Sequence, residues 1–247
     1  MIKYHRDYPG KRLSVNNIDF MQLEMVPENS RVLEIGCATG YMSDYLRKRK
    51  KCFVYGVEFN EGQCDIARHK CNKVLCGGID EKKIQESLDE FVNNYGKFDV
   101  VLMSQVVEHI AYPNGVLLKI KDWIPDHGVL IISTVNVAHW MGRMKLLFGK
   151  WEYEEYGIFD NTHLRFYTPA SLKKDLVMLG YEVVSEKYSY YDISPFFFLK
   201  KFRYKTAPIN IIARIPFFYR IASGLYRIFF NNIFTYQFAY KVRKCTK

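Results

Sequence analysis

The stretch Val32-Leu-Glu-Ile-Gly-Cys-Ala-Thr-Gly40, followed by Glu58, decides the fold. The apolar run at 31–35 predicts a buried strand, and it ends at a turn that contains two glycines. Such a turn lets a ligand approach the backbone closely, and an acid at the tip of the second strand can accept both hydroxyls of a ribose. Glu58 lies 18 residues after Gly40, within the range expected for that acid. Because the spacing is G-x-x-x-G and not G-x-G-x-x-G, the turn argues against NAD or FAD.

Outward from this turn, strand-like and helix-like segments alternate along the chain. Short apolar runs predict further strands at 52–57, 73–76, 98–103, 128–133 and 181–185. Helix-like segments lie between them at 41–50, 61–70, 116–124 and 169–179, with another that ends near Asn93. This alternation predicts an α/β fold with a Rossmann-like, doubly wound and largely parallel sheet that is covered on both faces.

The pattern changes near the end of the chain and then predicts one more strand. Apolar residues between 206 and 231 recur at helical spacing, which Pro216 interrupts. From Tyr236 to Val242 aromatic and aliphatic residues alternate with others at a period of two. We therefore expect a seven-stranded sheet with an α-helical insertion before its last strand, at 235–243. The predicted organisation is an N-terminal helical cap at 1–30, a core at 31–195, a basic, aromatic helical insertion at 196–234, and the last strand with the C-terminus at 235–247.

Positive charge is concentrated in the final fifth of the chain. The formal net charge is +10, yet residues 196–247 hold eleven of the 36 Lys and Arg residues and no Asp or Glu. Residues 1–195 are nearly neutral, with 25 basic and 26 acidic side chains. A hydrophobic fraction of 49% excludes a disordered chain, and the lack of an uncharged apolar run of ~18 residues argues against a spanning helix. Charged residues precede any apolar run at the N-terminus, so no signal peptide is expected.

The basic, aromatic segment leaves three interpretations open. At 196–231 it could bind an anionic membrane surface, with aromatic side chains at the lipid boundary and Arg and Lys toward the headgroups. It could instead bind nucleic acid, since basic residues interleaved with aromatics contact phosphates and stack on bases. It could also pack on the body or on a second subunit, as in a homodimer. We expect a cytoplasmic protein, with peripheral membrane association under the first interpretation.

The six cysteines follow no familiar metal or disulfide pattern. They lack paired C-x-x-C spacing, and the spacings among the first five fit no standard zinc site. Without a secretion signal, reduced thiols are expected and no metal is assigned. Cys52 and Cys76, on predicted strands, are expected to be core residues.

Four motifs, in order, resemble those of the class I S-adenosylmethionine-dependent methyltransferases. The first, acid-x-Gly-x-Gly-x-Gly, stands as Glu34-Ile-Gly-Cys-Ala-Thr-Gly40, with Ala38 in place of the middle glycine. The ribose-binding acid of the family matches Glu58, and its adenine-contacting acid matches Asp80 after the third predicted strand. Its fourth motif matches Phe98-Asp-Val-Val-Leu-Met-Ser-Gln-Val-Val-Glu-His109.

This resemblance covers roughly residues 28–186 and implies the fold, the cofactor S-adenosylmethionine and methyl transfer. A Rossmann-like domain that binds another nucleotide, or none, is the alternative. The cofactor-binding residues that the resemblance implies are Glu34, Gly36, Cys37, Ala38, Gly40, Glu58, Phe59, Gly78, Ile79, Asp80, Ser104 and Gln105.

His109 is the first candidate for a catalytic base. It follows Glu108 after the fourth predicted strand, at the carboxyl edge where ligands bind in open α/β sheets. A histidine titrates near neutrality, so His109 could take a proton from a hydroxyl; alternatively, it only caps a helix or lines the cofactor pocket. In quinone-type O-methyltransferases a similar stretch carries an extra Glu that has been linked to a divalent metal. The neutral Gln105 matches that position here, so no metal site is predicted.

A narrower resemblance concerns residues 136–168. Asn136-Val-Ala-His-Trp140 and Asp160-Asn-Thr-His-Leu-Arg-Phe-Tyr-Thr168 are similar to a methyltransferase subgroup of types 11 and 23. That subgroup includes MetW-like proteins and many enzymes of surface-polysaccharide and glycolipid gene clusters, and it implies that 136–168 is a substrate lid over the active site. The implied residues are His163 as a second base, Asp160 to orient it, Arg165 for an anionic substrate group, and Trp140 and Tyr167 as further substrate contacts. The alternative is structural, with an ion pair between Asp160 and Arg165 and packed aromatic rings.

These motifs favour methylation of a hydroxyl on a small molecule, a sugar or a lipid-linked acceptor. Methylation of nucleic acid is disfavoured because the Asn-Pro-Pro-Tyr type motif is absent after the fourth predicted strand, where Ser104-Gln105 stands. Two alternatives remain: a non-catalytic, MetW-like module that binds a partner enzyme, and a nucleic-acid methyltransferase that uses the basic C-terminal region.

Overall fold

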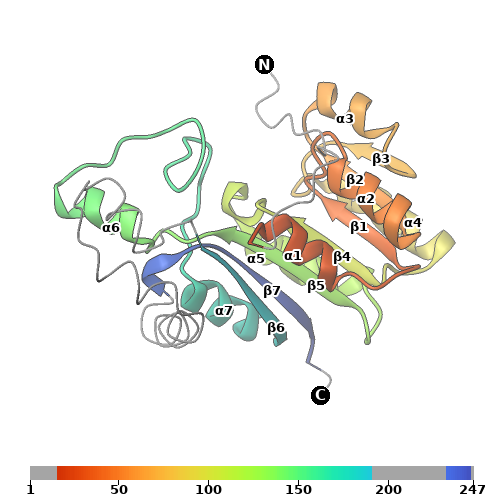
Figure 1. Ribbon diagram of the computed structural model, residues 1–247. Helices are drawn as coiled ribbons and strands as arrows, with labels where there is room; N and C mark the ends of the chain where they lie inside the picture. Colours follow the sequence, from red (N-terminus) through yellow and green to blue (C-terminus); the bar gives the residue numbers. More distant parts are fainter. Residues whose placement is uncertain (1–15, 191–231, 246–247) are drawn as a thin grey trace, which may run out of the picture.

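Seven strands form one mixed sheet in the computed structural model, which describes residues 16–190 and 232–245 (Figure 1). The strand order is β3-β2-β1-β4-β5-β7-β6; β7 runs antiparallel to β5 and β6, and the remaining pairs are parallel. The strands are β1 (Arg31–Ile35), β2 (Phe53–Glu58), β3 (Lys73–Cys76), β4 (Val100–Ser104), β5 (Val129–Val135), β6 (Tyr181–Tyr190) and β7 (Thr235–Lys244). The predicted Rossmann-like, doubly wound sheet is confirmed. Its order reverses between β1 and β4, the place where ligands bind in such folds.

Helices cover both faces of the sheet because successive strand residues point to opposite sides. In β4, Val101 and Met103 pack in the cluster that includes residues of α4, α5 and α7, whereas Val100 and Leu102 pack with α1 and α2. The helices are α1 (Ile18–Met25), α2 (Tyr41–Lys50), α3 (Glu61–Ala67), α4 (Lys82–Tyr95), α5 (Pro113–Trp123), α6 (Trp140–Leu147) and α7 (Pro169–Met178), with the short 3₁₀ turn η1 (Val107–His109). Strands buried on both faces explain why the runs read from the sequence were almost continuously apolar.

The strand predicted from the period-two pattern at the end of the chain is β7, which lies inside the sheet between β5 and β6. Phe238, Tyr240 and Val242 are fully buried, and the Tyr240 hydroxyl donates a hydrogen bond to the backbone oxygen of Pro169 at 2.8 Å. β6 is longer than the 181–185 run suggested. β6 lies at the edge of the sheet, where several of its side chains are exposed, so its sequence is not a continuous apolar run. Pairing with β7 extends the strand to Tyr190.

Residues 136–168 leave the sheet after β5 and return to it before α7. They contain α6, which the sequence did not predict because its residues show no clean apolar period. Figure 1 shows α6 standing apart from the sheet. The base of the segment is fixed at Asn136, whose side-chain amide donates hydrogen bonds to the backbone oxygens of Asn232 (2.8 Å) and Thr235 (2.9 Å).

Two expectations concern residues that lie wholly or largely outside the described ranges. The predicted insertion at 196–234 is described only at 232–234. The predicted N-terminal cap is described from residue 16, and there it contains α1, which packs on the sheet beside α2.

The expectation that all cysteines are reduced thiols is wrong for two of them. Cys64 in α3 and Cys76 at the end of β3 form a disulfide, with their Cα atoms 6.1 Å apart. α3 packs beside β3, which brings together two cysteines whose spacing of 12 residues matched no familiar pattern. Cys52, as predicted, is a core residue, whereas the same prediction is wrong for Cys76, which is only half-buried at the end of the edge strand β3. Cys37, Cys52, Cys71 and Cys245 are free thiols.

Candidate active site

The turn after β1 brings backbone amides to the carboxyl edge of the sheet. Gly36 and Gly40 have φ angles of 73° and 74°, and Ala38 between them has a φ of 47°. A Cβ added at Gly36 would lie 2.3 Å from Cγ2 of Val106, so both the backbone conformation and the neighbouring side chain require glycine there. The turn therefore presents a bare backbone surface at the reversal point between β1 and β4.

Glu58 lies at the end of β2, directly beside this turn, as the spacing predicted. It is 4% exposed; Oε2 accepts a hydrogen bond from the backbone N–H of Ala38 at 2.9 Å, and Oε1 accepts one from that of Asn60 at 3.0 Å. Burial raises the pKa of Glu58, which these two backbone hydrogen bonds counteract in part. The carboxylate is thus held in a fixed orientation against the turn, which suits it to accept hydroxyl hydrogens of a ribose.

Glu34 and Cys37 lie beneath the turn rather than on its surface. The Glu34 carboxylate accepts a hydrogen bond from the hydroxyl of Ser43 in α2, and burial raises its pKa well above the usual range. The Cys37 side chain packs against Ala67 and Cys71. These two predicted cofactor residues therefore support the turn from beneath. At Cys37 only the backbone could contact a ligand.

The segment after β3 lies next to Glu58 because β2 and β3 are paired. The Gly77 N–H donates to the backbone oxygen of Glu58 at 2.8 Å, and the predicted residues Gly78, Ile79 and Asp80 follow at once. Ile79 is buried and Asp80 is exposed. Phe59 is 72% exposed beside the buried Glu58 and offers a free aromatic face on which a base can stack.

Ser104 and Gln105, at the end of β4, belong to a chain of side-chain hydrogen bonds. Gln105 has a φ of 54°, and its Nε2 donates to the Ser133 hydroxyl at 2.9 Å while its Oε1 accepts from Nε2 of Gln237 at 3.2 Å. The Ser104 hydroxyl accepts from Nε2 of the fully buried Gln22 at 2.8 Å. The sequence did not predict that Gln22 and Gln237 belong to this site, because α1 and β7 come from opposite ends of the chain. The one available signal was that Gln237 is a glutamine within the aromatic alternation of β7.

Glu108, His109 and His163 meet beyond the carboxyl end of β4. The His109 and His163 rings are 4.9 Å apart between centroids, in an edge-to-face arrangement. Glu108 is 1% exposed, and neither of its carboxylate oxygens has a hydrogen-bond partner among the described residues. Burial raises its pKa to about 8. The structure thus joins both predicted bases and adds an acid that the sequence marked only as a neighbour of His109.

The same three side chains could hold a metal ion. One ligand atom from each of Glu108, His109 and His163 lies within 4.8 Å of the other two. Two imidazoles and one carboxylate form a donor set known from divalent transition-metal sites. The neutral Gln105, on which the prediction of no metal rested, is not part of this group.

Asp160 is buried and reaches His109 through Thr162. Its Oδ1 accepts hydrogen bonds from the backbone N–H (2.8 Å) and the hydroxyl (2.6 Å) of Thr162, and that hydroxyl lies 3.1 Å from Nδ1 of His109. The backbone oxygen of Glu108 accepts from the N–H groups of Leu164 and Arg165 at 2.8 and 3.0 Å. Residues 164–165 of the 136–168 segment are therefore hydrogen-bonded to η1, the turn that carries His109.

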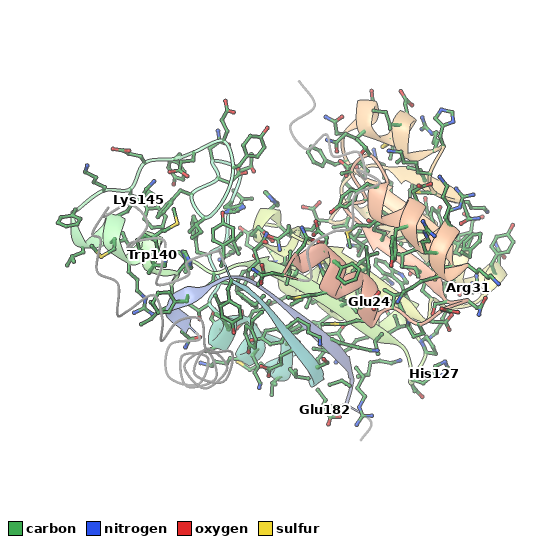
Figure 2. All side chains as sticks on the ribbon, in the orientation of Figure 1. Glu24, Arg31, His127, Trp140, Lys145 and Glu182 are labelled. Atoms are coloured by element: carbon green, nitrogen blue, oxygen red, sulfur yellow. A yellow bond between two sulfur atoms is a disulfide. The ribbon has the colours of Figure 1, made fainter. Side chains whose placement is uncertain are left out.

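The remaining predicted substrate residues, Arg165, Tyr167 and Trp140, lie in three different environments. The Arg165 guanidinium donates from Nε and Nη2 to the backbone oxygen of Ala111, at 2.9 and 2.5 Å, so it braces the 108–112 turn. Tyr167 is buried in the main core cluster, and burial raises its pKa to about 12. Trp140 begins α6, at the end of the molecule far from Arg31 and His127 (Figure 2). Arg165 and Tyr167 also line an open cavity of about 500 Å³, together with Tyr112, Asn114 and Asp175.

His139, which sequence reasoning passed over, precedes Trp140 and is fully buried. Burial lowers its pKa to about 4, so the imidazole is neutral near pH 7, and its Nδ1 accepts from the N–H of Met141 at the start of α6. It is a structural cap, and its place in a run of aromatic residues gave no signal that separates it from His163.

In residues 16–190 and 232–245 no helix is long and apolar enough to cross a membrane.

Comparison with known proteins places this geometry among methyltransferases. A family profile described as a methyltransferase domain matches residues 10–186. The ubiquinone biosynthesis O-methyltransferase of Dinoroseobacter shibae is 30% identical over 159 residues, which cover 64% of this chain and 62% of that protein. The enzyme of the same name from Azorhizobium caulinodans is 28% identical over 155 residues, or 62% of this chain and 59% of that protein. This chain thus spans about three fifths of the length of these curated relatives.

The fold is similar to solved structures over almost its whole length. The crystal structure of an S-adenosylmethionine-dependent methyltransferase from Archaeoglobus fulgidus matches with a TM-score of 0.61. The match covers 92% of this chain and 93% of that one at 18% sequence identity, so the likeness is one of fold.

Proposed function

The chain belongs to the class I S-adenosylmethionine-dependent methyltransferases, and on that premise we propose that it methylates a hydroxyl oxygen of a small-molecule, sugar or lipid-linked acceptor. The observation that carries the proposal is the Glu108–His109–His163 cluster at the carboxyl end of β4. A hydroxyl must lose a proton as it attacks a methyl group, and this cluster gathers two imidazoles that can take one. The relatives described above are named O-methyltransferases, which supports an oxygen acceptor.

The residues at the first strand ends fit the cofactor. The Gly36 turn leaves room for a ligand at the backbone, Glu58 presents a fixed buried carboxylate for a ribose, and Phe59 offers an exposed ring for the adenine. When bound, S-adenosylmethionine supplies a methyl group already activated by the sulfonium. The protein therefore has to orient the acceptor oxygen and accept its proton.

The geometry of the two histidines determines which nitrogen is basic. Nδ1 of His109 lies 3.1 Å from the backbone oxygen of Thr162, and Nδ1 of His163 lies 3.4 Å from that of Ile158. A carbonyl oxygen only accepts, so each Nδ1 carries the hydrogen and each Nε2 is the basic nitrogen. In this proposal the acceptor proton passes to Nε2 of one of these imidazoles.

The test measures methyl transfer and cofactor binding separately. His109→Ala and His163→Ala are each compared with His127→Ala, an exposed histidine in the turn before β5 (Figure 2). Labelled cofactor and a panel of hydroxylated acceptors are used in the presence of a chelator of divalent ions. We expect the variant that lacks the base to lose about 10²- to 10⁴-fold in turnover at unchanged cofactor affinity. Normal turnover in both variants, or a product methylated on nitrogen or carbon, would reject the proposal.

The cofactor assignment has its own test. Glu58→Ala should weaken S-adenosylmethionine binding by at least about tenfold, since one charge-assisted hydrogen bond to a ribose is worth about 1.5–3 kcal/mol. Glu61→Ala is the matched control, because Glu61 is an exposed acid three residues away in the first turn of α3. Equal affinity of the two variants by titration calorimetry would remove Glu58 from the cofactor site.

A peripheral contact with an anionic membrane surface is a further part of this proposal. The sequence at 196–247 carries eleven basic and no acidic residues. Among the described residues, Leu147 and Phe148 at the end of α6 are 74% and 68% exposed, next to Lys150. Exposed apolar side chains beside cations favour the boundary of an anionic bilayer, where a lipid-linked acceptor would be delivered.

A further inference from the structure

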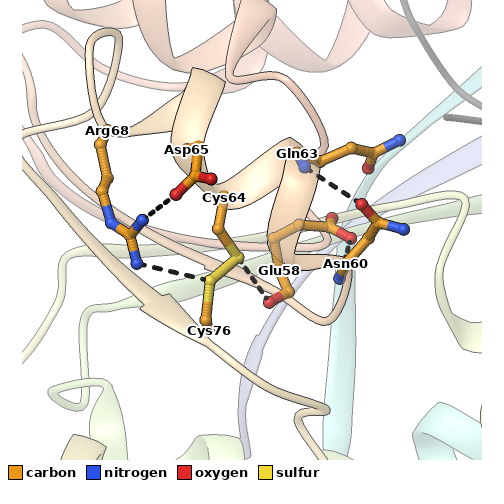
Figure 3. Close-up of polar contacts among 7 residues, drawn as sticks. All are labelled: Glu58, Asn60, Gln63, Cys64, Asp65, Arg68 and Cys76. Atoms are coloured by element: carbon orange, nitrogen blue, oxygen red, sulfur yellow. Dashed lines mark hydrogen bonds and ion pairs between the residues drawn. A yellow bond between two sulfur atoms is a disulfide. The ribbon is translucent and has the colours of Figure 1, made fainter.

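The two halves of the predicted adenosine site are joined by the Cys64–Cys76 disulfide. Cys64 lies in α3, which begins just after Glu58 and Asn60; Cys76 is the last residue of β3 and the ladder partner of Glu58 (Figure 3). The Cys64 sulfur lies 3.2 Å from the backbone oxygen of Glu58. We propose that this pair is a thiol–disulfide exchange site through which low-molecular-weight thiols set the affinity of the cofactor site. The inference rests on the cofactor residues of the proposed function.

Hydrogen bonds connect Glu58 to both of the elements that the disulfide joins. Toward α3, its Oε1 accepts from the N–H of Asn60, whose side chain in turn caps the helix at the N–H of Gln63 (Figure 3). Toward β3, its backbone oxygen accepts a hydrogen bond from the N–H of Gly77. Ile79, two residues after Gly77, is buried. The disulfide joins α3 to the end of β3, and hydrogen bonds tie Glu58 to the start of α3 and to the residue after β3, so the bond pre-orders both walls of the site for the ligand.

α3 depends on such a cross-link more than the longer helices do. It has seven residues, and helices this short are marginal without tertiary anchors. Cys64 itself is fully buried and is one of those anchors. When the bond is reduced, α3 loses its covalent tie to β3, and the position of Glu58 becomes less well defined.

The sulfur of Cys76 is the one that an incoming thiol can reach. Cys76 is half-buried, whereas Cys64 has no exposed surface. Nη2 of Arg68 lies 3.8 Å from the Cys76 sulfur, and the same guanidinium is held by Asp65 (Figure 3). A fixed positive charge attracts an anionic thiolate and stabilises the charge that develops during exchange.

The exchange balances without any other reactant. A thiolate RS⁻ attacks Sγ of Cys76, the Cys64–Cys76 bond breaks, and Cys64 leaves as a thiolate that takes the proton given up by RSH. A second RSH then attacks the mixed disulfide at the sulfur of the R group, releasing RSSR and the Cys76 thiol. In total, two thiols are oxidised, one protein disulfide is reduced, and two protons end on the two cysteines.

The experiment compares the affinity of the full-length oxidised and reduced protein for S-adenosylmethionine. Titration calorimetry is run before and after treatment with a dithiol, and alkylation with mass spectrometry counts the free thiols in each sample. We expect reduction to raise Kd by about fivefold or more, within the usual range of coupling between two sites. The Cys64→Ser/Cys76→Ser double variant should bind like the reduced protein and not respond to the dithiol. Cys245→Ser, which removes an exposed thiol just after β7, should respond like the unchanged chain.

Two results overturn the inference alone: equal Kd values for the two redox forms, or thiol counts that show Cys64 and Cys76 unpaired in the oxidised sample. Absence of binding in both forms would overturn the proposed function, and this inference with it. The role of the guanidinium is tested by Arg68→Gln, which should slow reduction by glutathione severalfold; an unchanged rate contradicts the assignment of Cys76 as the attacked sulfur.

Discussion

Gly36 is the residue on which the shape of the cofactor turn depends most directly. Gly36→Ala places a Cβ 2.3 Å from Val106 at a φ of 73°, so we expect a loss of about 1–3 kcal/mol in unfolding free energy and weaker cofactor binding. Gly115→Ala is the matched control, because Gly115 is helical and an added Cβ meets nothing within 4 Å. That variant should be neutral or more stable by up to about 1 kcal/mol. Urea unfolding and calorimetry check both, and equal behaviour of the two would show that the turn tolerates a side chain.

Glu108 predicts an unusual dependence of stability on pH. Its pKa is raised from 4.5 to about 8 by burial, so the folded protein binds one more proton than the unfolded chain between these values. Raising the pH through this window therefore lowers the unfolding free energy, by up to about 1.4 kcal/mol per pH unit. Glu108→Gln should match the unchanged protein near about pH 5 and exceed its stability by a few kcal/mol near about pH 9. Parallel pH curves for the two proteins, measured with a chelator present, would contradict this.

At the residue scale, contacts within one sequence motif could be predicted better than contacts between residues far apart in the chain. The contact between the Gly36 turn and Glu58 could be predicted from their spacing in the sequence, because they lie at the carboxyl ends of the neighbouring strands β1 and β2. The meeting of Glu108 with His163, 55 residues later, depends on the path of the 136–168 segment, which no local pattern encodes. Burial of Glu108, and with it the raised pKa, could not be read from a residue type that is usually exposed.

Among the elements, β7 is the last strand along the chain and yet lies inside the sheet, between β5 and β6. Its three fully buried side chains, Phe238, Tyr240 and Val242, are worth about 5–9 kcal/mol together, which is comparable with the whole stability of a domain. Deleting residues 196–247 should therefore abolish cooperative unfolding. Far-UV and near-UV circular dichroism during thermal denaturation would detect this loss.

A second variant separates the strand from the residues that precede it. Tyr190 pairs with Thr235 in the ladder, so a short hairpin turn can replace residues 191–234 without moving β6 or β7. We expect this variant to unfold cooperatively and to bind the cofactor. If it fails as the larger deletion does, the replaced residues contribute to the stability of the fold itself.

Strands of the sheet were predicted almost to the residue where both faces are covered, since burial there imposes an apolar run. β1, inside the sheet, has the predicted bounds, whereas β6 at one edge extends five residues further. α6 escaped prediction because it exposes most of its side chains and so has no apolar face to read. The Cys64–Cys76 bond escaped because the packing of α3, not the spacing of the cysteines, brings the sulfurs together.

For the molecule as a whole, the uneven charge predicts salt-dependent attraction to anionic bilayers. The full chain should sediment with phosphatidylglycerol-containing vesicles at low salt and be released by about 0.5 M salt, where the Debye length is a few Å. The hairpin variant that lacks 191–234 should bind less, because it loses seven of the eleven basic residues counted from 196 onward but keeps Leu147 and Phe148. Equal binding of the two proteins, or binding to neutral vesicles alone, would contradict an electrostatic contact through these residues.

The position of β7 also has a consequence for synthesis on the ribosome. β6 is made well before β7, yet in the described sheet β6 pairs only with β7, and β7 alone joins it to β5. Until β7 has left the exit tunnel, the nascent chain therefore carries an open edge on β5 and a ten-residue strand with no partner. Unpaired edges of this kind bind other chains, so the interval of translation between Tyr190 and Lys244 is when this protein most needs a chaperone.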